Sequence, residues 1–505
     1  MSNKAEELYK ELIEKIKEVA LIGSVESLLG WDEQCYLPRG GAEHRANQSA
    51  YMSGLFHKKF IDPRIGELLG ELENSDLMKD ELSDEAVNIR EIKYDYDKAV
   101  KIPQKLVEEL SHTTSMAHGV WAKARNENDF PSFLPYLEKI IKLVKEKAEC
   151  LGYKKEAYDA LLDNYEPGAT VDSIGKVFAG FRDDLVALVK AIGDSSQKPD
   201  VSIVEREYAV DRQEMFGRSA AAAIGYNFDT GRLDITAHPF TTEIGPGDVR
   251  ITTRYNPKHL GQALFGTLHE SGHGMYEQGL PVEHFGTPRG ESISLGIHES
   301  QSRLWENQVG RGKPFWKHFF PRAQQMFHEA LGGVKFDDFY FAINDVRPSL
   351  IRVEADEVTY NLHIILRFEM EHALISGDLA AKDAPGAWND KFKQFFDLTP
   401  PTDAEGVMQD VHWSAGYFGY FPTYSLGNLY SAQFYAKAKE DIPDLEKQFE
   451  IGQFGALKKW LNENIHSHGR RYRAEKLAEV VTGQPLTPKP LMDYLKAKYT
   501  ELYKL

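Results

Sequence analysis

Apolar residues recur at helical spacing along most of the first half of the chain. This spacing gathers them on one face of a helix with 3.6 residues per turn. In the first such segment they are Leu8, Leu12, Ile16, Ala20 and Leu21. The same period runs through residues 84 to 99, 103 to 125, 132 to 151 and 171 to 192. We therefore predict a mostly α fold whose first half is a helical scaffold.

The period changes between residues 227 and 255. Apolar positions here alternate with polar ones, as in half-buried strands, and a Gly-Pro-Gly turn interrupts them. The positions are Leu233, Ile235, Val249 and Ile251, with the turn at Gly245 to Gly247. We expect a small antiparallel sheet whose edge could bind an extended peptide by strand addition. The alternative is an ordinary hairpin that packs on helices.

A helical pattern returns after Asn256 and Pro257, which have the character of an N-cap and a first helical residue. We expect this helix to end at Gly279. It also carries Gly261, Gly266, Gly272 and Gly274. Each glycine costs about 1 kcal/mol relative to alanine. We therefore expect close packing around this helix, or room for a ligand.

This helix contains His269-Glu270-Ser271-Gly272-His273. Imidazoles at positions i and i+4 share one helix face and can bind one Zn²⁺, with Glu270 beside the open coordination position. A metzincin would need a third histidine at the position of Gly279, so that type of site is excluded. The better third ligand is Glu299, in the helix-like segment from Ile297 to Trp305. Two His and one Glu leave a position for water, which is typical of catalytic zinc.

These motifs and several others resemble the carboxypeptidase Taq family of zinc metallocarboxypeptidases. The further matching segments are Asp248 to Thr252, His298 to Gln301, Ile351 to Asp356 and Gly406 to Trp413, with upstream matches at Trp31 to Glu33, Pro38 to Glu43, Leu233 to Asp234 and His238 to Phe240. The resemblance implies a large helical metallopeptidase fold with a deep cleft and the small sheet beside the HEXXH helix. It also implies a homodimeric enzyme that removes single residues from peptide C-termini with broad specificity.

The resemblance also suggests substrate-binding residues. A guanidinium can bind both oxygens of a terminal carboxylate, and Arg352 is our candidate, although on its own it would pair with Asp356 one turn on. Arg250 is a weaker candidate. His412 would ordinarily be a core histidine, and the family context makes it a candidate site residue.

The run Tyr417 to Tyr424 is rich in glycine and aromatic residues and is expected to form a loop that lines the cleft. In it, Tyr420 could donate to a developing oxyanion. For Tyr424, aromatic packing without chemistry is equally compatible with the sequence.

We expect one Zn²⁺ per chain, with Co²⁺ as a compatible substitute, held by His269, His273 and Glu299. The metal would acidify water and polarise the scissile carbonyl, while Glu270 would act as general base and then protonate the leaving amine. The same chemistry would serve an oligopeptidase or endopeptidase acting on short peptides. A non-catalytic helical binding protein is the alternative of another class, and Glu270 argues against it.

The composition limits which binding partners and which cellular compartment we expect for the protein. The chain has 505 residues, 42% of them hydrophobic, and a net charge of −17, which argues against nucleic acid or an anionic membrane as partner. Cys35 and Cys150 fit a reducing compartment, and the N-terminus has no apolar export signal, so we expect a cytoplasmic enzyme. No linker separates autonomous halves. We expect one compact catalytic unit over residues 1–505, comprising the scaffold (1–226), the sheet (227–255) and metal-binding and cleft-lining helices (256–505).

Overall fold

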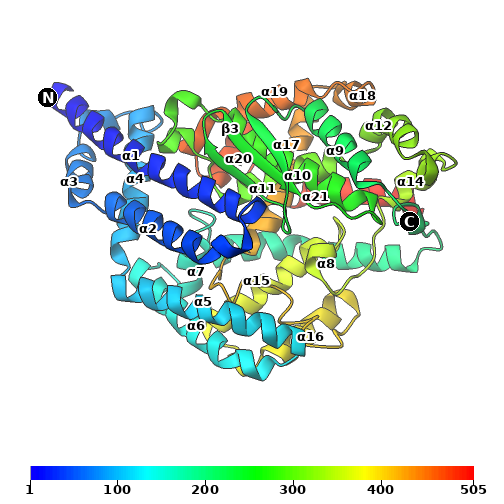
Figure 1. Ribbon diagram of the computed structural model, residues 1–505, viewed down its shortest axis with the longest axis horizontal. Coiled ribbons are helices and arrows are strands. Elements are labelled where there is room, and N and C mark those ends of the chain that lie inside the picture. The colour runs from blue at the N-terminus through cyan, green and yellow to red at the C-terminus, as the bar shows by residue number, and fades with distance from the viewer. Residues whose placement is uncertain (1) are drawn as a thin grey trace.

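The computed structural model describes residues 2–505 and is mainly helical, as the sequence predicts (Figure 1). The helices before the sheet are α1 (Ser2–Cys35), α2 (Ala42–Phe60), α3 (Pro63–Leu72), α4 (Asp84–Lys101), α5 (Gln104–Glu127), α6 (Phe130–Leu151), α7 (Ala157–Leu162), α8 (Val171–Asp194) and α9 (Val210–Ile224). Each periodic segment of the first half therefore coincides with a helix. Within residues 2–505, no helix is long and apolar enough to cross a membrane.

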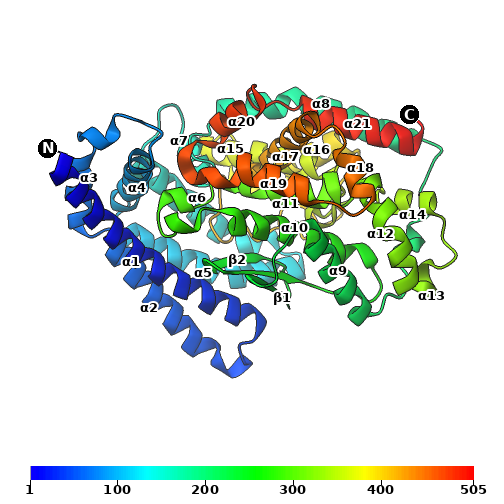
Figure 2. The same ribbon diagram turned by 90° about the horizontal axis from the view of Figure 1, so that it is seen from above.

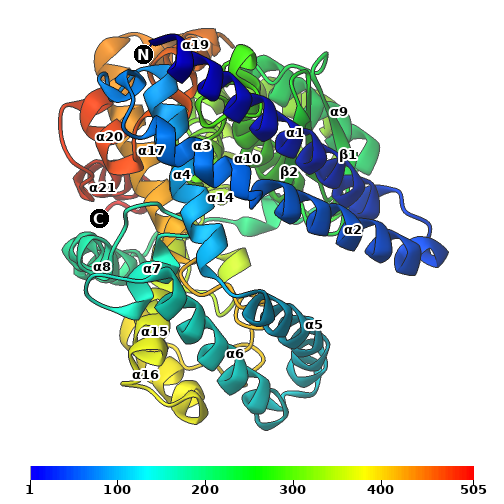
Figure 3. The same cartoon turned by 90° about the vertical axis from the view of Figure 1, so that its left-hand side faces the viewer.

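The helices after the sheet are α10 (Leu260–Gly279), α11 (Leu295–Arg303), α12 (Lys313–Met326), α13 (His328–Leu331), α14 (Phe336–Ala342), α15 (Tyr360–Ser376), α16 (Ala384–Phe396), α17 (Pro422–Asp441), α18 (Leu445–Glu450), α19 (Gly455–Asn464), α20 (Ala474–Thr482) and α21 (Lys489–Tyr503). Figure 1 shows the sheet near α10, with α5, α6 and α16 on the opposite side of the molecule. In the view of Figure 3, α5, α6, α15 and α16 again form a group apart from the sheet and α9.

The sheet consists of β1 (Gly231–Ile235), β2 (Thr241–Gly245) and β3 (Asp248–Thr253) in the order β1-β3-β2. Strand β2 pairs with β3 antiparallel, but β1 pairs with β3 parallel, so the prediction of an antiparallel sheet is wrong for one pair. Alternation of side chains is the same in both kinds of pairing and cannot fix strand direction. The order leaves β2 as an edge strand.

Helix α10 packs on β2 and β3, and it begins later than predicted. His259 is the N-cap, with its Nδ1 accepting from the backbone N–H of Gln262. The side chain of Asn256 instead accepts from the N–H of Lys258 and closes a turn before the helix. The predicted cap was wrong because asparagine makes the same short-range bond in a turn as at a cap. The predicted end at Gly279 is confirmed.

Glycines bring α10, α11 and α17 into backbone contact, as the glycine content of α10 led us to expect. A Cβ added to Gly272 would lie 2.5 Å from the carbonyl oxygen of Gln301 and 2.6 Å from the Cα of Ser302, both on α11. A Cβ added to Gly427 of α17 would overlap the side chain of Glu299. Helix α11 is therefore pressed between α10 and α17, with Glu299 in the junction.

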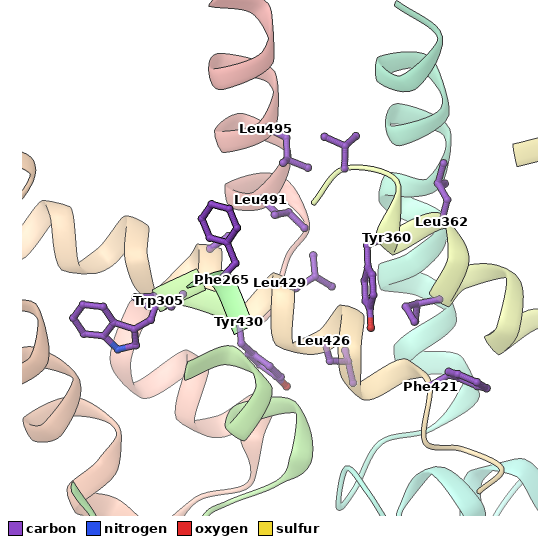
Figure 4. Close-up of a cluster of buried hydrophobic side chains, with 14 of the residues drawn as sticks. Phe265, Trp305, Tyr360, Leu362, Phe421, Leu426, Leu429, Tyr430, Leu491 and Leu495 are labelled. Atoms are coloured by element: carbon purple, nitrogen blue, oxygen red, sulfur yellow. The ribbon is translucent and has the colours of Figure 1, made fainter. Parts of the chain in front are cut away.

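Apolar side chains from distant parts of the chain surround this junction (Figure 4). Phe265 of α10, Leu426 and Tyr430 of α17, and Leu491 and Leu495 of α21 belong to one buried cluster, in which Trp305 is 1% exposed. A smaller cluster joins α1, α3 and α4. From above, α1 and α2 extend as a pair of helices beyond the rest of the molecule (Figure 2).

The α10–α11 contact leads to a stability prediction. Gly272→Ala forces a methyl group against backbone atoms of α11, so the helices must separate. We expect a loss of about 1–3 kcal/mol in the free energy of unfolding. Gly266→Ala is the control on the same helix, because its nearest neighbour would be Thr253 Oγ1 at 3.8 Å. That variant should be neutral, or more stable by up to about 1 kcal/mol. Denaturant unfolding of both variants provides the measurement, and equal effects would contradict the packing argument.

Candidate metal centre

The three predicted ligands lie together at the α10–α11 junction. The Nε2 atoms of His269 and His273 are 3.6 and 3.4 Å from the same carboxylate oxygen, Oε2 of Glu299. One ligand atom from each of the three residues lies within 4.8 Å of the others. Two imidazole nitrogens and one carboxylate oxygen facing a common point form a donor set that suits zinc and leaves a position open. The residues therefore fit a divalent transition metal.

Glu306 orients the first of these imidazoles. Its Oε2 lies 2.9 Å from His269 Nδ1, so the ring presents Nε2 to the ligand point. Glu306 lies in a π-helical turn, Leu304–Val309, that continues α11. Burial would raise the pKa of Glu306, but Arg303 and His269 outweigh it and lower the pKa to about 2. A buried carboxylate that accepts from a metal-ligating histidine fixes the tautomer of that histidine.

Arg303 orients the carboxylate of Glu299, as Glu306 orients the imidazole of His269. Its Nε donates to Glu299 Oε1 at 2.6 Å, so the other oxygen faces the imidazoles, and its Nη1 donates to Glu306 at 3.1 Å. Burial would raise the pKa of Glu299, but Arg303 and the two histidines hold it well below the usual range. Sequence reasoning missed Arg303 and Glu306. The spacing of Arg303 four residues after Glu299 was a usable signal, whereas the π-turn that places Glu306 was not.

Glu270 is buried beside the ligands. Its Oε2 accepts from the hydroxyl of Thr241 on β2 at 2.7 Å. Burial raises the pKa of Glu270, while His269 and Thr241 act in the opposite direction. A raised pKa brings a carboxylate closer to the range suited to proton exchange near neutral pH. The edge strand β2 thus contacts the predicted general base directly, a role for Thr241 that the sequence did not indicate.

Arg352 lies in a short 3₁₀ turn, Arg352–Glu354, and α15 begins only at Tyr360, so Asp356 does not lie one helical turn on from Arg352 as predicted. The carboxylate of Asp356 accepts from the backbone N–H groups of Val358 and Thr359, which closes a separate turn before the helix. Asp356 is also not the ion-pair partner of Arg352. The guanidinium instead donates to Asp410 Oδ1 through Nε at 3.0 Å and Nη2 at 2.9 Å.

Asp410 is shared between two buried arginines. Arg367 approaches Asp410 Oδ2 at 2.6 Å from the side opposite Arg352. Two guanidinium groups and one carboxylate carry a net charge of +1, and Arg367 is fully buried. A buried unit charge is costly unless an anion joins it. Since Arg352 Nη1 donates to Tyr360 at 2.8 Å, and Arg303 lies over the ring of Tyr360, Tyr360 connects this charge to the metal ligands.

The other predicted substrate residues surround Arg352. Burial lowers the pKa of His412 to about 4, so the ring is neutral, and its Nε2 lies 3.4 Å from the hydroxyl of Tyr424. The ring of Tyr420 lies 5.4 Å from those of His412 and Tyr424. The predicted loop ends earlier than expected, because α17 starts at Pro422 and places Tyr424 in its first turn.

Glu371 holds the loop that carries Tyr420. Its buried carboxylate accepts from Tyr158 at 2.6 Å, from Trp413 Nε1 at 2.8 Å and from the N–H of Gly419 at 2.8 Å. Gly419 has φ +91, and an added Cβ would meet the backbone of Leu161 at 2.7 Å. The loop therefore rests on α7 and α15. No motif in the sequence pointed to Glu371.

Arg250, the weaker candidate for substrate binding, lies on β3, and its contacts there are structural. It donates to both carboxylate oxygens of Asp248 at 2.7 Å and lies 4.0 Å above the ring of Trp31. These contacts join two of the segments on which the family resemblance rests, at Trp31 to Glu33 and Asp248 to Thr252. Arg250 therefore braces the sheet against α1.

Known proteins resemble this chain over nearly its whole length. The family model for carboxypeptidase Taq (M32) metallopeptidases matches residues 11–499. Thermostable carboxypeptidase 1 of Thermus thermophilus is 48% identical over 99% of each chain, and carboxypeptidase 1 of Bacillus subtilis is 39% identical over 98% of this chain and 99% of its own. The crystal structure of an M32 carboxypeptidase from Deinococcus radiodurans R1 matches with a TM-score of 0.95 and 42% identity, over 99% of this chain and 100% of that one. The chain therefore belongs to the carboxypeptidase Taq (M32) family and is a metallocarboxypeptidase, a peptide hydrolase.

Proposed function

We propose that this enzyme removes residues one at a time from peptide C-termini, with broad specificity, by attack of metal-activated water. The observation that carries the proposal is the buried net positive charge of Arg352, Arg367 and Asp410, linked through Tyr360 to the metal ligands. A site of this sign suits the terminal carboxylate of a peptide whose last amide bond lies at the metal.

Zinc is the proposed metal, one ion per chain, held by His269, His273 and Glu299, and Co²⁺ should substitute for it. When bound, such an ion lowers the pKa of water to about 7 and polarises a carbonyl group. The site before metal binding supports this choice. Glu299 and Glu306 are paired with Arg303, and Glu306 also with Arg311, but Oε2 of Glu299 faces the imidazoles as an anionic oxygen that a divalent cation can bind.

Glu270 is the proposed general base. Its carboxylate takes a proton from the attacking water and returns it to the leaving amine. Burial favours this exchange because a desolvated carboxylate binds a proton more readily than an exposed one. The bond from Thr241 holds Oε2, so the side chain keeps its orientation during turnover.

The substrate's C-terminus is proposed to bind at Arg352, at the end of the site away from the metal ligands. Arg352 uses three N–H groups on Asp410 and Tyr360 and, with five in total, retains capacity for a carboxylate oxygen. His412 and Tyr420 lie beside it as neutral groups that can bind the peptide end or the developing oxyanion. We propose that the peptide backbone adds to the free edge of β2. Arg250 supports that edge rather than binding the carboxylate.

The larger organisation is also a proposal. The larger of the two buried clusters extends from Ala117 to Tyr503, which supports one catalytic unit over most of the chain. The homodimer follows from the family resemblance, and the free thiols of Cys35 and Cys150 support a cytoplasmic setting. The deep cleft stays a prediction.

Two glutamine variants test the assignment of roles at the metal centre. Glu270→Gln cannot accept a proton, so zinc content should survive while kcat falls by several orders of magnitude. Glu299→Gln removes an anionic ligand and should lower zinc content first. Elemental analysis after dialysis, together with kcat at saturating zinc, gives the two readouts. Equal zinc content in the two variants would show that the assignment is wrong.

A mass-spectrometric time course on one unmodified peptide tests the proposed activity. We expect a ladder that loses one C-terminal residue at a time. The same peptide with an amidated C-terminus should be cleaved about 30- to 1000-fold more slowly, because a charge-assisted contact of roughly 2–4 kcal/mol is lost. Internal fragments, or equal rates on the acid and the amide, would favour an oligopeptidase instead.

Arg352→Ala removes the same contact from the enzyme side. On the free acid it should cost a similar factor, and on the amide it should cost little more, since both changes delete one interaction. Arg352→Lys should recover only part of the rate, because ammonium lacks the planar fork. Arg250→Ala is the control. Its contacts lie on Asp248 and Trp31, so any loss of rate should be equal for acid and amide.

A further inference from the structure

His298 occupies an unusual position directly before the third ligand. Its Nδ1 lies at short hydrogen-bond distance from Nδ1 of His273, and its Nε2 lies 2.6 Å from Oε1 of Glu277. His273 and Glu277 are one turn apart on α10, whereas His298 comes from α11. The ring of His298 therefore bridges two residues of the facing helix. His269, by contrast, contacts a carboxylate directly.

The direction of these hydrogen bonds follows from the ligand role proposed for His273. Its Nε2 faces Glu299 Oε2 and must be free of hydrogen to bind a metal, so the neutral ring carries its proton on Nδ1. That N–H donates to Nδ1 of His298, which must accept. His298 then carries its own proton on Nε2 and donates it to Glu277. Each ring thus has one allowed tautomer.

Glu243 completes the chain of groups from the edge strand β2. It shares a hydrogen bond with Glu277, and burial, together with the negative charge of Glu277, raises the pKa of Glu243 to about 9. Glu277 thus lies between the carboxyl group of Glu243 and Nε2 of His298 and can accept from both. The two carboxyl groups line a cavity of about 100 Å³ between β2 and the end of α10.

We propose that His298, Glu277 and Glu243 form a positioning relay that fixes the tautomer and ring orientation of His273. The proposal rests on the proposed metal-binding role of His273. His269 contacts the carboxylate of Glu306 directly, whereas the ring of His298 lies between His273 and the carboxylate of Glu277. The relay joins α10, α11 and β2, the same three elements that carry His273, Glu299 and Thr241.

Metal affinity of the purified full-length protein tests the relay. We would measure the Kd for Co²⁺ by competition with a chromophoric chelator, and the visible spectrum of the Co²⁺ form. His298→Phe keeps the ring but removes both nitrogens and should weaken binding about 10- to 100-fold, with an altered spectrum. His298→Asn retains an acceptor near the position of Nδ1 and should recover part of the affinity. His372→Phe is the control, because it removes a similar His–Glu pair, with Glu156 at 2.5 Å, away from the metal ligands.

A second pair of variants covers the possibility that His298→Phe does not fold. Glu277→Gln keeps an acceptor for His298 but loses the charge, so it should bind Co²⁺ more weakly than the wild type and more tightly than Glu277→Leu. Wild-type affinity and spectrum in folded His298→Phe, or in both Glu277 variants, would overturn the relay. Failure of the wild-type protein to bind Co²⁺ would instead contradict the proposed metal site, so the two failures are distinguishable.

Discussion

The backbone contact between α10 and α11 at Gly272 determines the geometry of the whole site. Two imidazoles on one helix face supply only two ligands, and a glutamate from another helix reaches the same point only if that helix lies very close. Gly272 permits that approach on one side of α11, and Gly427 of α17 leaves space for the Glu299 side chain on the other. The glycines in α10 lower its intrinsic helix propensity. Packing in the buried cluster around the junction compensates for this loss.

Charge is arranged along one buried path that starts at this junction. At the metal end, Glu299 and Glu306 face Arg303 and Arg311, and at the other end two guanidinium groups face Asp410. Arg303 and Arg352 both contact Tyr360, which lies between the two ends. The three groups Arg352, Arg367 and Asp410 thus have a net positive charge, which suits the carboxylate that we propose binds there. Because buried charges left unpaired are costly, the proposed carboxylate would relieve a cost that folding alone does not remove.

The sequence predicted those features that depend on local pattern or on motifs. Helical periodicity located α1, α4, α5, α6 and α8 but not α2, α3, α7 and α9. The HEXXH spacing with Glu299 identified three residues that the fold brings together. Features that depend on tertiary contacts were missed. The direction of β1, the cap at His259 and the partner of Arg352 each had a plausible local alternative. The roles of Glu306 and Glu371 could not be predicted from the sequence. A π-turn places Glu306 beside His269, and a buried loop brings Gly419 to Glu371.

We propose that close packing of α10 against α11 creates one metal site with a defined set of ligand atoms. Anomalous diffraction at the zinc edge from crystals of the zinc-loaded protein tests it most directly. We expect one strong peak per chain, at about 2.0–2.2 Å from Nε2 of His269, Nε2 of His273 and a carboxylate oxygen of Glu299. Zinc bound through Nδ1 of either histidine, or the main peak at another place in the chain, would contradict it.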